Sequence, residues 1–147
     1  MGITTDALAR ALAAEDEAVF GYGVLGPHLD AADASTARDD QAAHEALRDT
    51  AQGVLAARRA AVPAPQADYP DLYPVRTAGQ ARALAVRLET QAASAWRAAF
   101  AAAVAASPVD TVLRDRALAA LTDTALRATR WRLAIGTGPA TVPFPGL

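Results

Sequence analysis

Three charged or titratable residues stand on the apolar faces of three helix-like patterns, where such side chains are uncommon. They are Glu15, His44 and Glu89. Divalent metal ions bind several carboxylate oxygens, and an imidazole often completes the coordination shell. These residue types on separate helices therefore suggest a metal centre inside a helical protein.

A complete di-metal centre of this kind follows a stricter pattern. It takes one carboxylate from each of two helices and a Glu-x-x-His pair from each of the other two. The second predicted helix holds Gln41-Ala-Ala-His44, with glutamine in place of glutamate and Asp40 as the nearest carboxylate. The fourth predicted helix holds Asp123, but Leu126 stands where the histidine belongs. The ligand set is therefore incomplete.

Two arginines on the fourth predicted helix change the expected chemistry. Arg127 and Arg130 follow Asp123, and a guanidinium inside a bundle can neutralise a buried carboxylate without a metal. We therefore expect a salt-bridged remnant of a metal site, with no cofactor. One alternative is a working single-metal or altered di-metal site that binds iron or manganese through Glu15, His44, Glu89 and Asp123. Another is that these residues occupy ordinary positions at the boundary between core and surface.

The composition restricts the class of protein. The 147 residues suit one domain spanning 1–147. Cysteine is absent, which excludes disulfides, thiol nucleophiles and zinc–thiolate sites. The net charge of −2 gives no basic footprint for nucleic acid. No apolar run approaches the roughly 20 residues of a membrane span, and Met1–Arg10 lacks a signal-peptide pattern, so we expect a cytoplasmic protein with no membrane contact.

The sequence pattern favours an all-α fold. Alanine is the most abundant residue and the best helix former. Apolar residues recur every three or four positions in four segments, which predicts helices at about 6–25, 36–61, 77–106 and 108–135. The expected caps are Thr5, Ser35 or Thr36, Thr77, Ser107 followed by Pro108, and Gly136 at the C-terminal end. Residues 137–147 contain three prolines and are expected to form an extended tail packed on the bundle.

The predicted connections indicate the topology. The first and third are short, which makes antiparallel neighbours. The second, Val62–Arg76, has about 15 residues with four prolines and can reach about 46 Å, roughly the length of a 29-residue helix. We therefore expect a ferritin-like antiparallel four-helix bundle with a long Pro-rich crossover between helices 2 and 3, held by Tyr69 and Tyr73. The alternative is a plain up-down-up-down bundle with a longer loop.

The crossover also predicts where the charged residues lie along the bundle. In that topology the first helix ends, and the third begins, at the same end. Glu15 and Glu89 lie about a dozen residues from that end. We therefore expect them at nearly the same height.

Several short stretches together carry a resemblance to a known family. They are Ala14–Gly26, His44–Asp49, Leu88-Glu89 with Ala95–Arg97, Trp131-Arg132 and Phe144–Gly146. As a set they resemble an actinobacterial family that has a ferritin-like domain and no assigned function, although Asp16 stands where that pattern has histidine or asparagine. The resemblance covers nearly the whole chain. It implies a ferritin-like bundle and no established reaction or cofactor.

These observations predict a ferritin-like protein with a degenerate, metal-free site and an interaction or structural role, acting as a homodimer. No nucleophile accompanies His44 at a recognisable spacing, which disfavours an enzyme. The main alternative is a metal-binding oxidoreductase or storage-type protein that uses iron or manganese with a reduced ligand set. A weaker alternative is an apolar ligand site where small alanines leave space between helices.

Overall fold

The computed structural model describes residues 2–147, and this part of the chain contains four long helices. They are α1 (Ile3–Leu25), α2 (Ala31–Ala57), α3 (Ala78–Ala105) and α4 (Thr111–Ile135), with 3₁₀ turns η1 (Gly26–His28) and η2 (Pro70–Leu72). No strand occurs in residues 2–147, so the all-α prediction is confirmed there. A search of the same residues finds no helix with the length and apolarity to cross a membrane.

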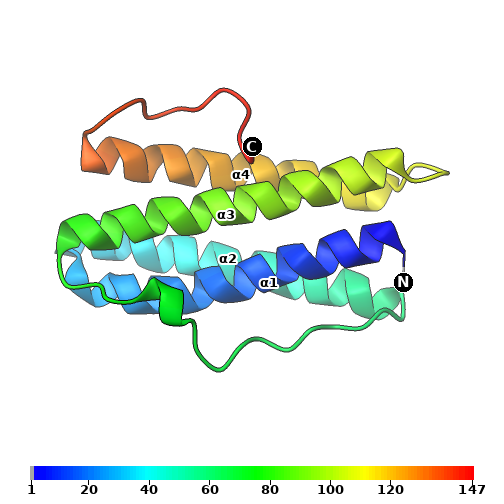
Figure 1. The fold of residues 1–147 in the computed structure, drawn as a ribbon, viewed down its shortest axis with the longest axis horizontal. Helices are drawn as coiled ribbons and strands as arrows, with labels where there is room; N and C mark the ends of the chain where they lie inside the picture. The colour runs from blue at the N-terminus through cyan, green and yellow to red at the C-terminus, as the bar shows by residue number, and fades with distance from the viewer. Residues whose placement is uncertain (1) are drawn as a thin grey trace.

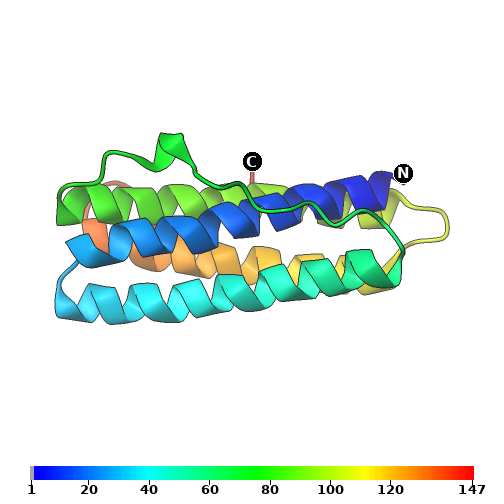
Figure 2. The same ribbon diagram turned by 90° about the horizontal axis from the view of Figure 1, so that it is seen from below.

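The four helices lie side by side along their lengths (Figure 1). Helices α1 and α2 run in opposite directions, and so do α3 and α4. Between α2 and α3, residues 58–77 run along the bundle from the end where α2 stops to the end where α3 begins (Figures 1 and 2). This path leaves α1 and α3 in contact with each other.

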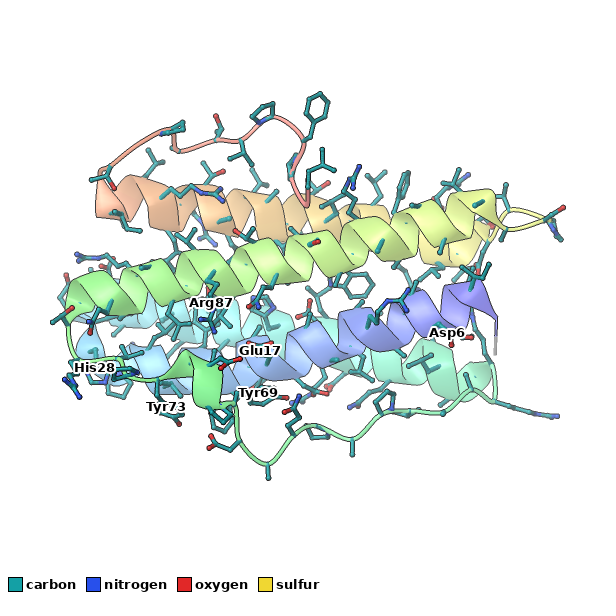
Figure 3. The ribbon with its side chains drawn as sticks, viewed as in Figure 1. Asp6, Glu17, His28, Tyr69, Tyr73 and Arg87 are labelled. Atoms are coloured by element: carbon teal, nitrogen blue, oxygen red, sulfur yellow. The ribbon has the colours of Figure 1, made fainter. Side chains whose placement is uncertain are left out.

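One aromatic residue holds the long connection to the bundle. Tyr69 is buried, and its ring centroid lies 5.2 Å from that of Phe20 on α1. Arg87 of α3 donates a hydrogen bond to the carbonyl of Asp71 at 3.0 Å, and Figure 3 shows Tyr69, Tyr73 and Arg87 along this face. Tyr73 is 50 % exposed, so of the two tyrosines expected to pin the segment only Tyr69 does so.

Three helix starts differ from the prediction, two of them because other side chains act as caps. Helix α2 begins after Asp30, whose carboxylate accepts a hydrogen bond from a backbone N–H at 3.0 Å, and Thr36 lies within the helix. Helix α4 begins after Asp110, which caps it in the same way at 3.1 Å in place of Ser107. In α1 the cap is Gly2 rather than the predicted Thr5.

The ends of the helices follow backbone conformation. Helix α2 stops at Ala57, four residues earlier than expected, because Arg59 adopts a φ of 53°, a left-handed conformation that closes helices. Thr77 caps α3 as predicted. Gly136 ends α4 with a φ of 75°, also as predicted.

The core combines small and large side chains. Alanines of α3 and α4 are buried where they face neighbouring helices, so these helices pack closely. Trp96, Trp131 and Tyr22 are the largest fully buried side chains, whereas Phe100 is half-buried. At Gly21 a Cβ atom would lie 2.5 Å from the Leu88 side chain, which shows that α1 and α3 approach closely there.

The C-terminal tail contains no helix, as predicted. It folds back over α3 and α4 and ends near the middle of the bundle (Figure 1). Its backbone packs against α3 at Gly146, where a Cβ atom would lie 2.7 Å from the carbonyl oxygen of Ala93. Phe144, the largest apolar residue of the tail, is 75 % exposed.

Candidate functional site

Glu15 of α1, His44 of α2 and Glu89 of α3 meet inside the bundle, and none of the three has exposed surface. They come from three helices at one level because α1 ends and α3 begins at the same end of the molecule (Figure 1). The sequence predicted that the two glutamates lie at nearly the same position along the bundle, and the structure agrees.

His44 bridges the two glutamates. Its Nδ1 lies 2.6 Å from Oε2 of Glu15, and its Nε2 lies 2.9 Å from Oε1 of Glu89. Ionised carboxylates are only acceptors. A ring that faces two such acceptors must donate from both nitrogens, so the geometry fits a doubly protonated imidazolium.

Two aromatic side chains complete the hydrogen bonding of the glutamates. The indole N–H of Trp96 donates to Oε1 of Glu15 at 2.6 Å. The hydroxyl of Tyr22 donates to Oε1 of Glu89 at 2.6 Å. Both oxygens of Glu15 are thus engaged, one by the histidine and one by the tryptophan.

Arg127 of α4 supplies the second positive charge of the site. Its Nε lies 3.1 Å from Oε2 and 3.2 Å from Oε1 of Glu89. The side chain is nearly buried, and its Nη2 is a buried polar atom with no hydrogen-bond partner. The expected pairing of a buried glutamate with an arginine of the fourth helix is therefore present.

A third acidic residue extends the network. Asp40 of α2 is buried, and its carboxylate accepts hydrogen bonds from Arg130 at 2.8 Å and from the indole of Trp131 at 2.9 Å. The same indole N–H lies 2.9 Å from the hydroxyl of Tyr22. The polar network therefore contains residues from all four helices.

Burial and neighbouring charges shift the pKa values of this group. Burial lowers the pKa of His44, but hydrogen bonds and charge attraction from Glu15 and Glu89 outweigh it and raise that pKa to about 9. Burial raises the pKa of Asp40, and the negative charge of Glu89 adds to that shift. Burial also raises the pKa of Tyr22 well above its usual value. At neutral pH His44 is therefore the charged partner of two carboxylates.

Other residues considered from the sequence lie outside this centre. Asp123 is exposed on α4 and takes no part in the network. The side chain of Gln41 donates a hydrogen bond to the carbonyl of Val19 at 3.1 Å and forms none with Glu15 or Glu89. His28 lies at one end of the bundle (Figure 3).

Tyr22, Trp96 and Trp131 are buried in the core and are not among the site residues expected from the sequence. Each also places a donor group on a buried carboxylate or on another member of the network. A signal was present, because tyrosine and tryptophan that are fully buried usually require a partner for their O–H or N–H. The buried glutamates and these aromatics satisfy each other.

The donor set lacks the convergence that a metal ion requires. Within residues 2–147, no three His, Asp or Glu side chains form a group that could hold a metal ion. Each ring nitrogen of His44 points at a glutamate carboxylate, so the nitrogens and the carboxylate oxygens do not share a common centre.

Comparisons with known proteins assign the chain to a family. Residues 7–147 match the family model described as "Domain of unknown function (DUF4439)". The chain is also similar to the crystal structure of a conserved hypothetical protein, rv2844, from Mycobacterium tuberculosis, with 34 % identity, 97 % of each chain covered and a TM-score of 0.83. None of the curated proteins matches. Because the family model covers nearly the whole sequence, the chain belongs to the DUF4439 family.

Proposed function

We propose that this protein is a single-domain, ferritin-like bundle in which a charge-compensated core has replaced a di-metal site, and that its role is structural or interactive rather than catalytic. The observation that carries the proposal is His44 hydrogen-bonded through both ring nitrogens to Glu15 and Glu89. The three residues keep the positions of metal ligands but act as partners for one another.

The charges of the core balance without a metal. Glu15 and Glu89 are compensated by protonated His44 and by Arg127. A metal ion needs free lone pairs, and an imidazolium has none. A guanidinium 3.1 Å from Glu89 also repels a divalent cation. These residues do not fit iron or manganese.

The path of the chain supports the ferritin-like part of the proposal. The connection between α2 and α3 runs the length of the bundle (Figures 1 and 2), and two hairpins joined by one long crossover are typical of ferritin-like proteins. The carboxylates of α1 and α3 and the histidine of α2 lie where such proteins place metal ligands. The fourth pair of ligands is missing, because Asp123 is exposed.

The alternative function, an iron or manganese oxidoreductase or storage protein, makes an opposite prediction. We would titrate metal-free protein with Fe(II) without oxygen, and separately with Mn(II), by calorimetry. The proposal predicts no stoichiometric binding at micromolar metal. Stoichiometric binding that is lost in Glu15→Ala and His44→Ala but retained in the control His28→Ala would establish the alternative instead.

A further inference from the structure

The molecule has an apolar groove that the core network does not use. It lies between the C-terminal tail and the faces of α3 and α4, with a volume of about 680 Å³. Residues 141–147 form one wall, and the tail arches over these two helices (Figure 1). A volume of this size is within the usual range of small-molecule sites.

Small side chains create the space. Ala93, Ala125 and Ala128 line the groove, and Leu126 and Phe144 contribute larger apolar groups. Leu126 and Phe144 are 60 % and 75 % exposed, so the apolar walls face solvent. Exposed apolar surface around a concave site is typical of a binding surface.

Three of the four threonines that line the groove donate their hydroxyl hydrogen to a backbone carbonyl of their own helix. The hydroxyl of Thr90 donates to the carbonyl of Val86 at 2.7 Å, and that of Thr129 donates to the carbonyl of Ala125 at 3.0 Å. Thr122 bonds in the same way within α4. One residue of the groove has a charged side chain.

That residue is Arg132, which has no acidic partner within the part of the chain described. Its Nη2 donates to the Thr90 hydroxyl at 3.2 Å, whereas Arg127 and Arg130, earlier on the same helix, are paired with carboxylates. The guanidinium retains further N–H donors in a planar fork that suits a carboxylate. An unpaired cation beside an apolar groove is complementary to an amphiphile with a negative head.

We propose that this groove binds a single-chain fatty carboxylate, with the head group on Arg132 and the alkyl chain along the alanine-lined walls beneath the tail. The backbone contact of Gly146 with α3 holds the tail at the far side of the site. Phe144 has a φ of 59°, an uncommon conformation for a residue other than glycine. Phe144 also lines the groove, where its ring would contact the alkyl chain.

The test uses decanoate below its micelle concentration, titrated into the whole protein by calorimetry. We expect saturable 1:1 binding, about tenfold tighter than that of octanoate because two more methylenes are buried. Neutral 1-decanol should bind at least tenfold more weakly. Arg132→Gln should reduce decanoate affinity to the level of decanol, while Arg114→Gln, an exposed arginine at the start of the same helix, should leave it unchanged.

A further readout locates the ligand. In NMR spectra, decanoate should shift the amide signals of Thr90, Ala125 and Phe144. The proposal is overturned if decanoate shows no saturable binding, if decanol binds equally well, or if Arg132→Gln has the affinity of the wild type. It is also overturned if these signals respond to protein concentration and not to decanoate, because a second copy of the chain would then occupy the groove.

Discussion

Two effects act on the pKa of His44 in opposite directions, and their balance determines the chemistry of the core. Burial favours the neutral imidazole, whereas two carboxylates within 2.9 Å favour the charged form. The carboxylates prevail, since the pKa of His44 is raised to about 9. A neutral histidine would keep a lone pair for a metal ion, and a charged one does not.

This balance predicts how stability depends on pH. The pKa of His44 in the folded protein, about 9, lies above its ordinary value of 6.5. The extra stability is therefore fully present below pH 6.5 and is lost as pH rises through 9. Urea unfolding should show a decrease on the order of 3 kcal/mol over this range.

The two histidines of the chain provide a matched comparison for that experiment. His44→Gln should flatten the pH dependence of unfolding between pH 6.5 and 9. His28→Gln, which changes an exposed residue at the end of the bundle, should preserve it. Equal pH dependence in wild type and His44→Gln would contradict our assignment of the charge.

The second residue-scale prediction concerns Arg127. Arg127→Ala leaves Glu89 buried beside His44 with one positive charge too few, and we expect a loss of about 3–5 kcal/mol in the free energy of unfolding. Arg114→Ala removes an exposed pair with Asp115 on the same helix and should leave the urea midpoint unchanged. An equally small effect of both variants would show that the buried pair is not needed.

At the scale of helices, the contact between α1 and α3 predicts opposite effects for two nearby glycines. Gly21→Ala places a methyl 2.5 Å from buried Leu88, and overpacking of this kind costs about 1–3 kcal/mol. Gly23→Ala is exposed and meets only the Gln41 amide at 3.8 Å, so it should stabilise α1 by about 0.5–1 kcal/mol. Thermal unfolding measures both, and a stabilising Gly21→Ala would disprove the close approach.

The sequence predicted the helices well and three of their starts poorly. Periodicity locates a helix, but several residues can cap it, and burial and pairing decide among them. Asp110 caps α4 rather than Ser107, and Asp110 is also paired with Arg58 at the end of α2 at 2.6 Å. That pairing joins residues far apart in the chain, so the local pattern could not reveal it.

The limits of local sequence patterns also explain which site residues were predicted and which were not. The placement of Glu15, His44 and Glu89 followed from helix lengths and loop reach. The sequence pattern did not fix the rotation of the fourth helix, on which the prediction for Asp123 depended. Adjacent helical residues point about 100° apart, so Asp123 is exposed while its neighbour Thr124 is buried. Arg127 lies about one turn beyond Thr124 and therefore also points inward.

At the scale of the whole molecule, the polar network links all four helices. Contacts between alanine-rich helix faces alone would not specify how the helices align along the bundle axis. Buried polar groups can fix one arrangement among several similar ones. The hydrogen bonds of Glu15, Asp40, Glu89 and Arg127 all depend on the axial alignment of their helices. A fixed helix register is thus a structural role for these buried residues.

The homodimer is the prediction at the molecular scale. Leu118 and Leu133 are 49 % and 65 % exposed on α4, and their spacing places them on one side of the helix. Light scattering at high micromolar concentration should give twice the mass of one chain. Combined Leu118→Glu and Leu133→Glu should give a monomer, while Ile3→Glu, an exposed control, should not. A monomeric wild type would refute the prediction.

The most direct test of the account is the protonation state of His44 itself. ¹⁵N NMR of the histidine ring, assigned with His44→Gln, distinguishes a protonated nitrogen from one with a free lone pair. We predict that at pH 7 both ring nitrogens of His44 carry protons and that one proton is lost only near pH 9. An unprotonated ring nitrogen at pH 7 would contradict the account, because the buried histidine would then be free to bind a metal ion.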